Sequence, residues 1–181
     1  LVQAGLHEIR FSVKQDDKPE LLEKVLERMA WARELVPTVM VEMPVIPGTD
    51  SFMKELLVKL DALGVDGINL LEFAYAMWNW PVFLTLRNPP QQVVFDYTYA
   101  GALAVQDSEE DCLRLMLWAH EQSLELSLHY CSLENKHRAQ MRNTNEPFAD
   151  IHPCYAFDYD DFFLKTALAF DSDRDPVRRV L

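Results

Sequence analysis

The sequence predicts an α/β fold, arranged as a partial (β/α) barrel of parallel strands with alternating helices. Strand-like apolar segments begin at residues 7, 38 and 67, roughly 30 residues apart, which is the length of one β-α-β unit. Between them, apolar residues recur every three or four positions, as on the buried face of a helix. Helical crossovers of this length predict parallel, neighbouring strands with right-handed connections.

The first half of the chain supplies two such units. Residues 7–13 alternate polar and apolar side chains with the period of a strand. A helix is expected over 18–36, capped by Asp17, with Pro19 in its first turn and Pro37 beyond its end. The remaining elements of this half are a strand at 38–46, a helix at 52–63 that Gly64 ends, and a strand at 67–73.

The start and the middle of the chain depart from the repeat. Gly5, directly before the first strand, is typical of a helix end, so we expect the chain to open part-way through a barrel that is incomplete at its N-terminal side. Residues 74–106 predict an irregular insertion with a short strand or two. Its aromatic residues, which include Trp78, Trp80 and Phe83, are expected to form a small core of their own, with the lining of a pocket as the alternative.

Regular structure returns after the insertion. Asp107 and Ser108 are expected to cap a helix that runs to about residue 122. A strand is predicted at 125–131 and a short helix at 133–142. The barrel units are assigned to residues 1–145 and a C-terminal extension to residues 146–181.

Composition and charge exclude several classes of partner. Hydrophobic residues make up 49% and charged residues 25% of the chain, which is typical of a globular protein. The net charge of −12 disfavours nucleic acid as a partner. The longest apolar runs are interrupted by Glu42 and Glu72 and are too short to span a bilayer, so no membrane partner is expected.

The cysteines indicate a reducing, cytoplasmic environment. The chain has three of them, Cys112, Cys131 and Cys154, an odd number at wide spacing with no CxxC pair. This count excludes a four-thiolate metal site within the chain. His129 has no second ligand at strand or helix spacing, so no metal site is predicted.

Candidate functional residues follow from the strand positions, because ligands of parallel α/β sheets bind at the carboxyl ends of the strands. The candidates are Arg10, Ser12, Glu42, Asn69, Glu72, His129 and Cys131. Glu42 is the most unusual, since an unpaired charge buried in this apolar strand would cost several kcal/mol. A structural alternative is an ion pair between Glu42 and Arg10 on the neighbouring strand. The period of two places Asn69 and Glu72 on opposite sides of their strand.

Five segments carry a family resemblance. They read AGLHEIRF at 4–11, VEMPVIPG at 41–48, GINLLEF at 67–73, DSEE at 107–110 with Trp118-Ala119, and HYCS at 129–132 followed by Lys136, Gln140 and Arg142. In this order they resemble a group of radical S-adenosylmethionine proteins related to pyruvate formate-lyase activating enzyme. The chain departs from that group's pattern at Leu71, where the group usually has Asn, and over residues 74–106, where nothing matches.

The resemblance implies the C-terminal portion of an iron–sulfur oxidoreductase of unknown substrate. The missing N-terminal half of the barrel would be its partner and would carry a CxxxCxxC loop that ligates a [4Fe–4S] cluster. S-adenosylmethionine on this cluster would be cleaved reductively to a 5′-deoxyadenosyl radical. This chain lacks the cysteine motif and alone would be inactive.

By position, the resemblance makes five residues candidates for cofactor binding and two for substrate contact. The cofactor candidates are Arg10, Ser12, Glu42, Asn69 and Glu72, and the substrate candidates are His129 and Cys131. Two other hypotheses stay open. One is a different (β/α)-barrel enzyme with lyase-like acid–base chemistry at Glu42 and His129, and the other is a non-catalytic binding module derived from a barrel.

Overall fold

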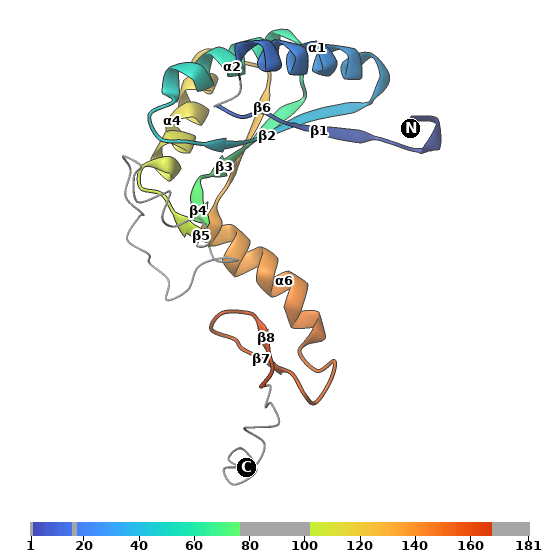
Figure 1. Ribbon diagram of the computed structural model, residues 1–181, viewed down its shortest axis with the longest axis vertical. Helices are drawn as coiled ribbons and strands as arrows, with labels where there is room; N and C mark the ends of the chain where they lie inside the picture. Colours follow the sequence, from blue (N-terminus) through green and yellow to red (C-terminus); the bar gives the residue numbers. More distant parts are fainter. Residues whose placement is uncertain (1, 16–17, 77–101, 168–181) are drawn as a thin grey trace. The chain divides into compact units, whose positions relative to one another are not determined.

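The computed structural model describes residues 2–15, 18–76 and 102–167 (Figure 1). The chain divides into two compact units, Leu1–Leu133 and Glu134–Leu181. The first unit contains the predicted sheet, and the second contains a helical segment and a small hairpin. A membrane-spanning helix is not found among the described residues, where no helix combines the necessary length and apolar character.

Within the described residues, four parallel strands form the main sheet of the first unit. They are β1 (Glu8–Ser12), β2 (Thr38–Val45), β3 (Gly67–Glu72) and β6 (Ser127–Cys131), in the order β1-β2-β3-β6. A 3₁₀ turn, η1 (Val2–Ala4), precedes β1. The predicted α/β class, with parallel strands and alternating helices, is confirmed.

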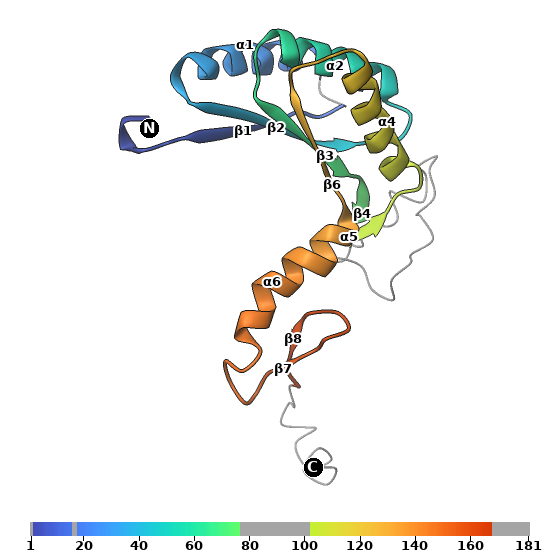
Figure 2. The ribbon, with the colours of Figure 1, turned by 180° about the vertical axis from the view of Figure 1, so that it is seen from behind.

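Three helices cover one face of this sheet (Figures 1 and 2). They are α1 (Pro19–Leu35), α2 (Asp50–Ala62) and α4 (Ser108–Glu121). The strand order follows the chain without reversal, so right-handed crossovers place every helix on the same side. The helices and this side of the sheet share one core, in which alternate residues of β2 are at most 1% exposed: Val39, Val41, Met43 and Val45.

The helix ends agree in part with the sequence. Pro19 is the first residue of α1, and Val36, directly before Pro37, is already extended. Gly64 ends the α2 segment with a φ of +66°, a left-handed conformation that favours glycine. Asp17 lies outside the described residues. Asp107 is the N-cap residue of α4, as predicted, but it has a φ of 73° and makes no capping hydrogen bond with its side chain.

Gly67 allows β3 to pack closely against both neighbouring strands. A β-carbon at this position would lie 2.8 Å from the carbonyl oxygen of Ser127 and 3.0 Å from Cε of Met40. The carbonyl belongs to the backbone of β6 and cannot move without disturbing the sheet.

We therefore expect Gly67→Ala to lower the free energy of unfolding by about 1–3 kcal/mol, the usual cost of overpacking. Urea denaturation followed by circular dichroism would measure it. In a strand with free space, alanine would instead stabilise the protein by restricting the unfolded chain. An increase in stability would therefore contradict this close packing.

The two ends of the insertion pair with each other in a two-stranded antiparallel sheet. Strand β4 (Ala74–Ala76) pairs with β5 (Ala102–Ala104), which confirms the prediction of short strands in this region. Tyr75 is buried on β4, and its ring lies edge-on to that of Phe73, with 5.6 Å between the centroids. The predicted aromatic core of Trp78, Trp80 and Phe83 lies outside the described residues.

A continuous helical segment follows β6. It consists of α5 (Leu133–Asn135), the π-helical turn η4 (Lys136–Met141) and α6 (Arg142–Asn145), and a 3₁₀ turn, η5 (Glu146–Phe148), comes next. The predicted helix at 133–142 is therefore present and longer than expected. Two ion pairs at i,i+4 spacing line it, Arg138 with Glu134 and Arg142 with Glu146.

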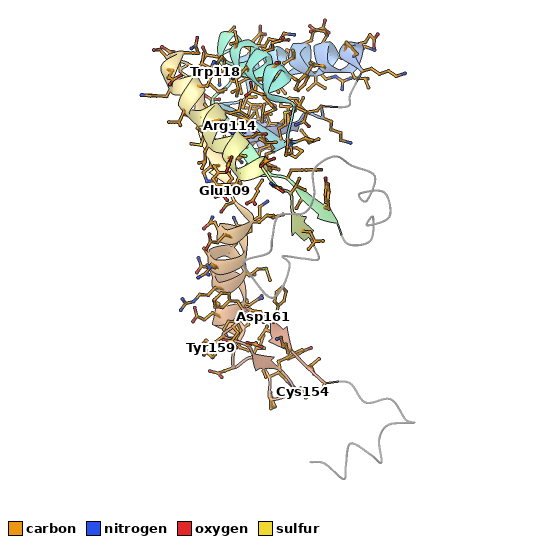
Figure 3. All side chains as sticks on the ribbon, turned by 90° about the vertical axis from the view of Figure 1, so that its left-hand side faces the viewer. Glu109, Arg114, Trp118, Cys154, Tyr159 and Asp161 are labelled. Carbon is orange, nitrogen blue, oxygen red and sulfur yellow. The ribbon has the colours of Figure 1, made fainter. Side chains whose placement is uncertain are left out.

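The second unit also contains an antiparallel hairpin of β7 (Ala156–Phe157) and β8 (Leu164–Lys165). The Phe157 ring packs edge-on against Tyr159, 4.9 Å between centroids. Figure 3 shows Tyr159 and Asp161 in the connection between the two strands. Lys165 Nζ lies 2.5 Å from a carboxylate oxygen of Asp158 and 2.5 Å from one of Asp161, so one ammonium group bridges both carboxylates.

We expect this hairpin to loosen as the pH falls below about 4. The hydrogen bond from Lys165, followed by that from the Asp160 amide, lowers the pKa of Asp158. A lowered pKa adds stability above the ordinary value, which is lost as protons bind at lower pH. NMR amide exchange in the hairpin would measure the change. Lys165→Met should weaken this pH dependence, because only hydrogen bonds from backbone amides, that of Asp160 first, would then lower the pKa of Asp158. A pH dependence unaltered by that substitution would contradict the explanation.

Candidate functional site

The face of the sheet opposite the helices carries a row of polar side chains. The register pairs Ser12 with Glu42, Glu42 with Asn69, and Asn69 with His129, so these four residues cross all four strands side by side. Directly paired residues of parallel strands share a face, and neighbouring strands lie about 4.8 Å apart. We refer to Ser12, Glu42, Asn69 and His129 as the polar row.

The Glu42 carboxylate is the centre of the hydrogen bonds in this row. Its Oε1 accepts from Arg10 Nη1 at 2.6 Å and from Asn69 Nδ2 at 3.2 Å. Arg10 also bonds to Glu8, and these two carboxylates, Glu8 first, raise the pKa of its guanidinium. The ion pair between Glu42 and Arg10, a structural alternative on the sequence alone, is therefore present.

This ion pair contributes little to folding. The side chain of Arg10 is 50% exposed and that of Glu42 is 38% exposed. Ion pairs at this exposure stabilise proteins by about 0–1 kcal/mol. The contacts therefore orient the Glu42 carboxylate on the helix-free face, and folding does not require them.

The next row toward the carboxyl ends of the strands is apolar. The register pairs Pro44 with Leu71, and Leu71 with Cys131. Pro44 and Leu71 are half-buried, and Cys131 is 9% exposed. A ligand on this face would therefore meet polar groups at the middle of the sheet and an apolar wall at the strand ends.

Glu72 lies on the other face, against the helices. It is 8% exposed, and its Oε2 accepts hydrogen bonds from the Leu133 backbone N–H at 2.7 Å and from the Tyr130 hydroxyl at 3.1 Å. Burial, followed by the Glu72 charge, raises the pKa of Tyr130 and keeps the phenol a donor. The structure thus separates Glu72 from the polar row, as the period of two predicts.

The Ser108 hydroxyl connects α4 to the sheet, a role that the sequence-based prediction of a helix cap did not include. The side chain is fully buried, and Oγ donates to the Val45 carbonyl at 2.8 Å and accepts from the Phe73 N–H at 2.8 Å. The first residue of α4 thereby joins the carboxyl ends of β2 and β3. Sequence alone gives no signal for this, because the partners are 63 and 35 residues away.

The cysteines lie in three different environments. Cys112 is buried on α4, where burial first and then the charge of Glu72 raise the pKa of its thiol to about 12. It is therefore a poor nucleophile. Cys131 ends β6, and Cys154 is exposed in the second unit. Within the described ranges, no three side chains of His, Cys, Asp or Glu form a group that could hold a metal.

A shallow groove of about 370 Å³ lies between α2 and α4, lined by Lys54, Glu55, Val58, Lys59 and Trp118. Lys54 Nζ lies 5.5 Å from the centroid of the Trp118 ring. None of the predicted site residues lines this groove, which is separate from the polar row. Figure 3 labels Trp118 and Arg114 on α4.

Comparison with known proteins gives no relative: no protein-family model, curated protein or solved structure matches this chain. The arguments about function therefore rest on the residues themselves. Of the seven predicted site residues, the structure brings Ser12, Glu42, Asn69 and His129 into one row. It bonds Arg10 to that row, places Cys131 beside it and places Glu72 on the opposite face.

Proposed function

We propose that the sheet is the later part of a (β/α) barrel and that the chain is the C-terminal portion of a radical S-adenosylmethionine oxidoreductase. The polar row on the helix-free face is the observation that carries this proposal. In (β/α) barrels all helices lie outside, and the functional groups line the inner end of the strands. Doubly wound sheets carry helices on both faces instead.

The sheet edges support the same proposal. In the part of the chain that the structure describes, the sheet ends at β1 on one side and at β6 on the other. Open strand edges present unpaired backbone donors and acceptors, which barrels remove by closure. The missing N-terminal strands would pair with β1, and the polar row would then face the interior of the barrel.

The polar row is chemically suited to S-adenosylmethionine. A carboxylate, an amide and a hydroxyl offer acceptors and donors for the ribose hydroxyls and the amino group of the ligand, and Arg10 offers donors for its carboxylate. Glu42, Asn69, Ser12 and Arg10 would hold this cofactor. His129, at the far end of the row, and Cys131, beside it, would contact the substrate.

Bound to a [4Fe–4S] cluster, S-adenosylmethionine supplies one-electron chemistry that ends in hydrogen abstraction from a substrate. The cluster ligands would come from the missing half of the barrel. In this chain, Arg10 and Asn69 orient the Glu42 carboxylate, and the apolar row of Pro44, Leu71 and Cys131 limits the access of water. Three unpaired thiols suit a reducing compartment, so a cytoplasmic location is part of the proposal.

The coding sequence upstream of Leu1 tests the family assignment. Two or three β-α-β units further back, at about 60–100 residues, we expect a CxxxCxxC motif. The longer protein should then bind a [4Fe–4S] cluster on anaerobic reconstitution and release 5′-deoxyadenosine with a reductant. A different barrel front without these cysteines would contradict the proposal.

The geometry also favours a second function, acid–base catalysis by another (β/α)-barrel enzyme. Glu42 and His129 lie on either side of Asn69 in the polar row, about two strand spacings or 9–10 Å apart. A small substrate between them could exchange protons with both groups. Turnover without any cluster, lost in both Glu42→Gln and His129→Ala, would select this function.

A further inference from the structure

The segment after β6 is fixed from the helix side of the sheet. Tyr130 precedes Cys131 and Ser132, and Leu133 follows them. The Tyr130 hydroxyl and the Leu133 N–H both donate to the same oxygen of Glu72, at 3.1 Å and 2.7 Å. The Glu72 carboxylate on β3 therefore binds the residue before and the residue after the two-residue segment Cys131-Ser132.

Strand β6, which carries Tyr130, also carries two residues of the candidate site, and they lie on its opposite face. His129 and Cys131 flank Tyr130, so their side chains point away from Glu72 onto the face of the polar row. A shift of Tyr130 or of the Leu133 backbone would displace both. Glu72 itself is 8% exposed and faces the helix layer, where its charge contributes to the raised pKa of the Cys112 thiol on α4.

We propose that Glu72 is a positioning residue, which fixes His129 and Cys131 on the helix-free face by holding Tyr130 and Leu133, on either side of Cys131-Ser132, and does not touch a ligand itself. This differs from the cofactor contact that the family resemblance implies for Glu72. The importance of His129 and Cys131 for a ligand rests on the proposed function. The mechanical role of Glu72 does not.

The three cysteines of the chain can report this role. Cys131 belongs to the held segment, Cys112 lies in the core under α4, and Cys154 is exposed in the second unit. Alkylation with iodoacetamide, followed by mass spectrometry of each cysteine peptide, would give three rates for each variant of the chain.

Three variants change the contacts of Glu72, and a fourth serves as a control. Glu72→Ala removes both hydrogen bonds, Tyr130→Phe removes one, and Glu72→Gln keeps an oxygen acceptor. Glu121→Gln, an exposed residue at the end of α4, is the matched control for charge.

Glu72→Ala removes both hydrogen bonds to the charged group, so we expect the rate at Cys131 to rise by at least about tenfold, with no change at the exposed Cys154. The rate at Cys112 should rise less than that at Cys131, because the Glu72 charge is only the second cause, after burial, of the raised pKa of the Cys112 thiol. Tyr130→Phe and Glu72→Gln should give smaller increases at Cys131, and Glu121→Gln none. An unchanged rate at Cys131 in all three variants would overturn the proposal. Equal increases at Cys112 and Cys131 in Tyr130→Phe, which keeps the Glu72 charge, would also overturn it, because the contact would then support the whole unit.

The outcome is independent of the proposed function. Failure of the longer protein to cleave S-adenosylmethionine would remove the radical mechanism and leave the alkylation rates unaffected. If cleavage is observed, Glu72→Gln should raise KM for the substrate more than it lowers the rate of cofactor cleavage, because the displaced residues are the substrate candidates. Direct weakening of S-adenosylmethionine binding in Glu72→Gln, at unchanged Cys131 reactivity, would show a ligand contact and contradict the positioning role.

Discussion

Under the proposed function, replacing Glu42 by glutamine is expected to lower the reductive cleavage of S-adenosylmethionine about 10- to 100-fold in a longer protein that binds the cluster. The Glu42 carboxylate is the hub of the polar row, where Arg10 and Asn69 both bond to its Oε1. Glutamine has nearly the same shape but lacks the charge. Hydrogen bonds to a charged group contribute about 1.5–3 kcal/mol, which corresponds to this range of rates.

Chromatographic measurement of 5′-deoxyadenosine would test this prediction. Glu121→Gln removes one charge from an exposed site and should retain full activity. The free energy of unfolding of Glu42→Gln should fall by at most about 1 kcal/mol, because the ion pair with Arg10 is exposed. Unchanged cleavage would exclude Glu42 from the cofactor site. A large loss of stability would show that the carboxylate serves the fold.

Replacing Ser108 by alanine is expected to cost about 2–5 kcal/mol of stability. The hydroxyl group satisfies the Val45 carbonyl and the Phe73 N–H in a fully buried position. Without it, a buried donor and a buried acceptor lose their partner, and each such group costs about 1–3 kcal/mol. The ends of β2 and β3 would also lose their connection to α4.

Urea denaturation of Ser108→Ala would measure this cost. Ser51→Ala is the matched control, since Ser51 lies exposed near the start of α2 and should change stability by less than about 0.5 kcal/mol. In Ser108→Ala, amide hydrogen exchange should rise first at Phe73, because its N–H loses the Ser108 hydroxyl as acceptor. Phe73 directly follows the last pair of β2 and β3, Val45 with Glu72. A cost below about 1 kcal/mol would indicate that these groups find other partners.

The sequence by itself determined the elements of the first unit and their parallel pairing. Apolar residues at period two and at three-to-four spacing are local patterns, and crossovers of this length join parallel strands. The predicted strand at 38–46 is observed as β2 (Thr38–Val45), and the predicted helix at 18–36 as α1 (Pro19–Leu35). The opposite orientations of Asn69 and Glu72 followed from the same alternation.

Only the tertiary structure decided which of these residues meet. The row of Ser12, Glu42, Asn69 and His129 depends on the register between four strands, and a shift by one residue would turn each side chain to the other face. The prediction that Ser108 helps to cap α4 was wrong for the same reason. Local sequence cannot show that a carbonyl and an amide from two different strand ends both bond to the Ser108 hydroxyl. Register and burial arise from contacts between distant segments, whereas periodicity is local.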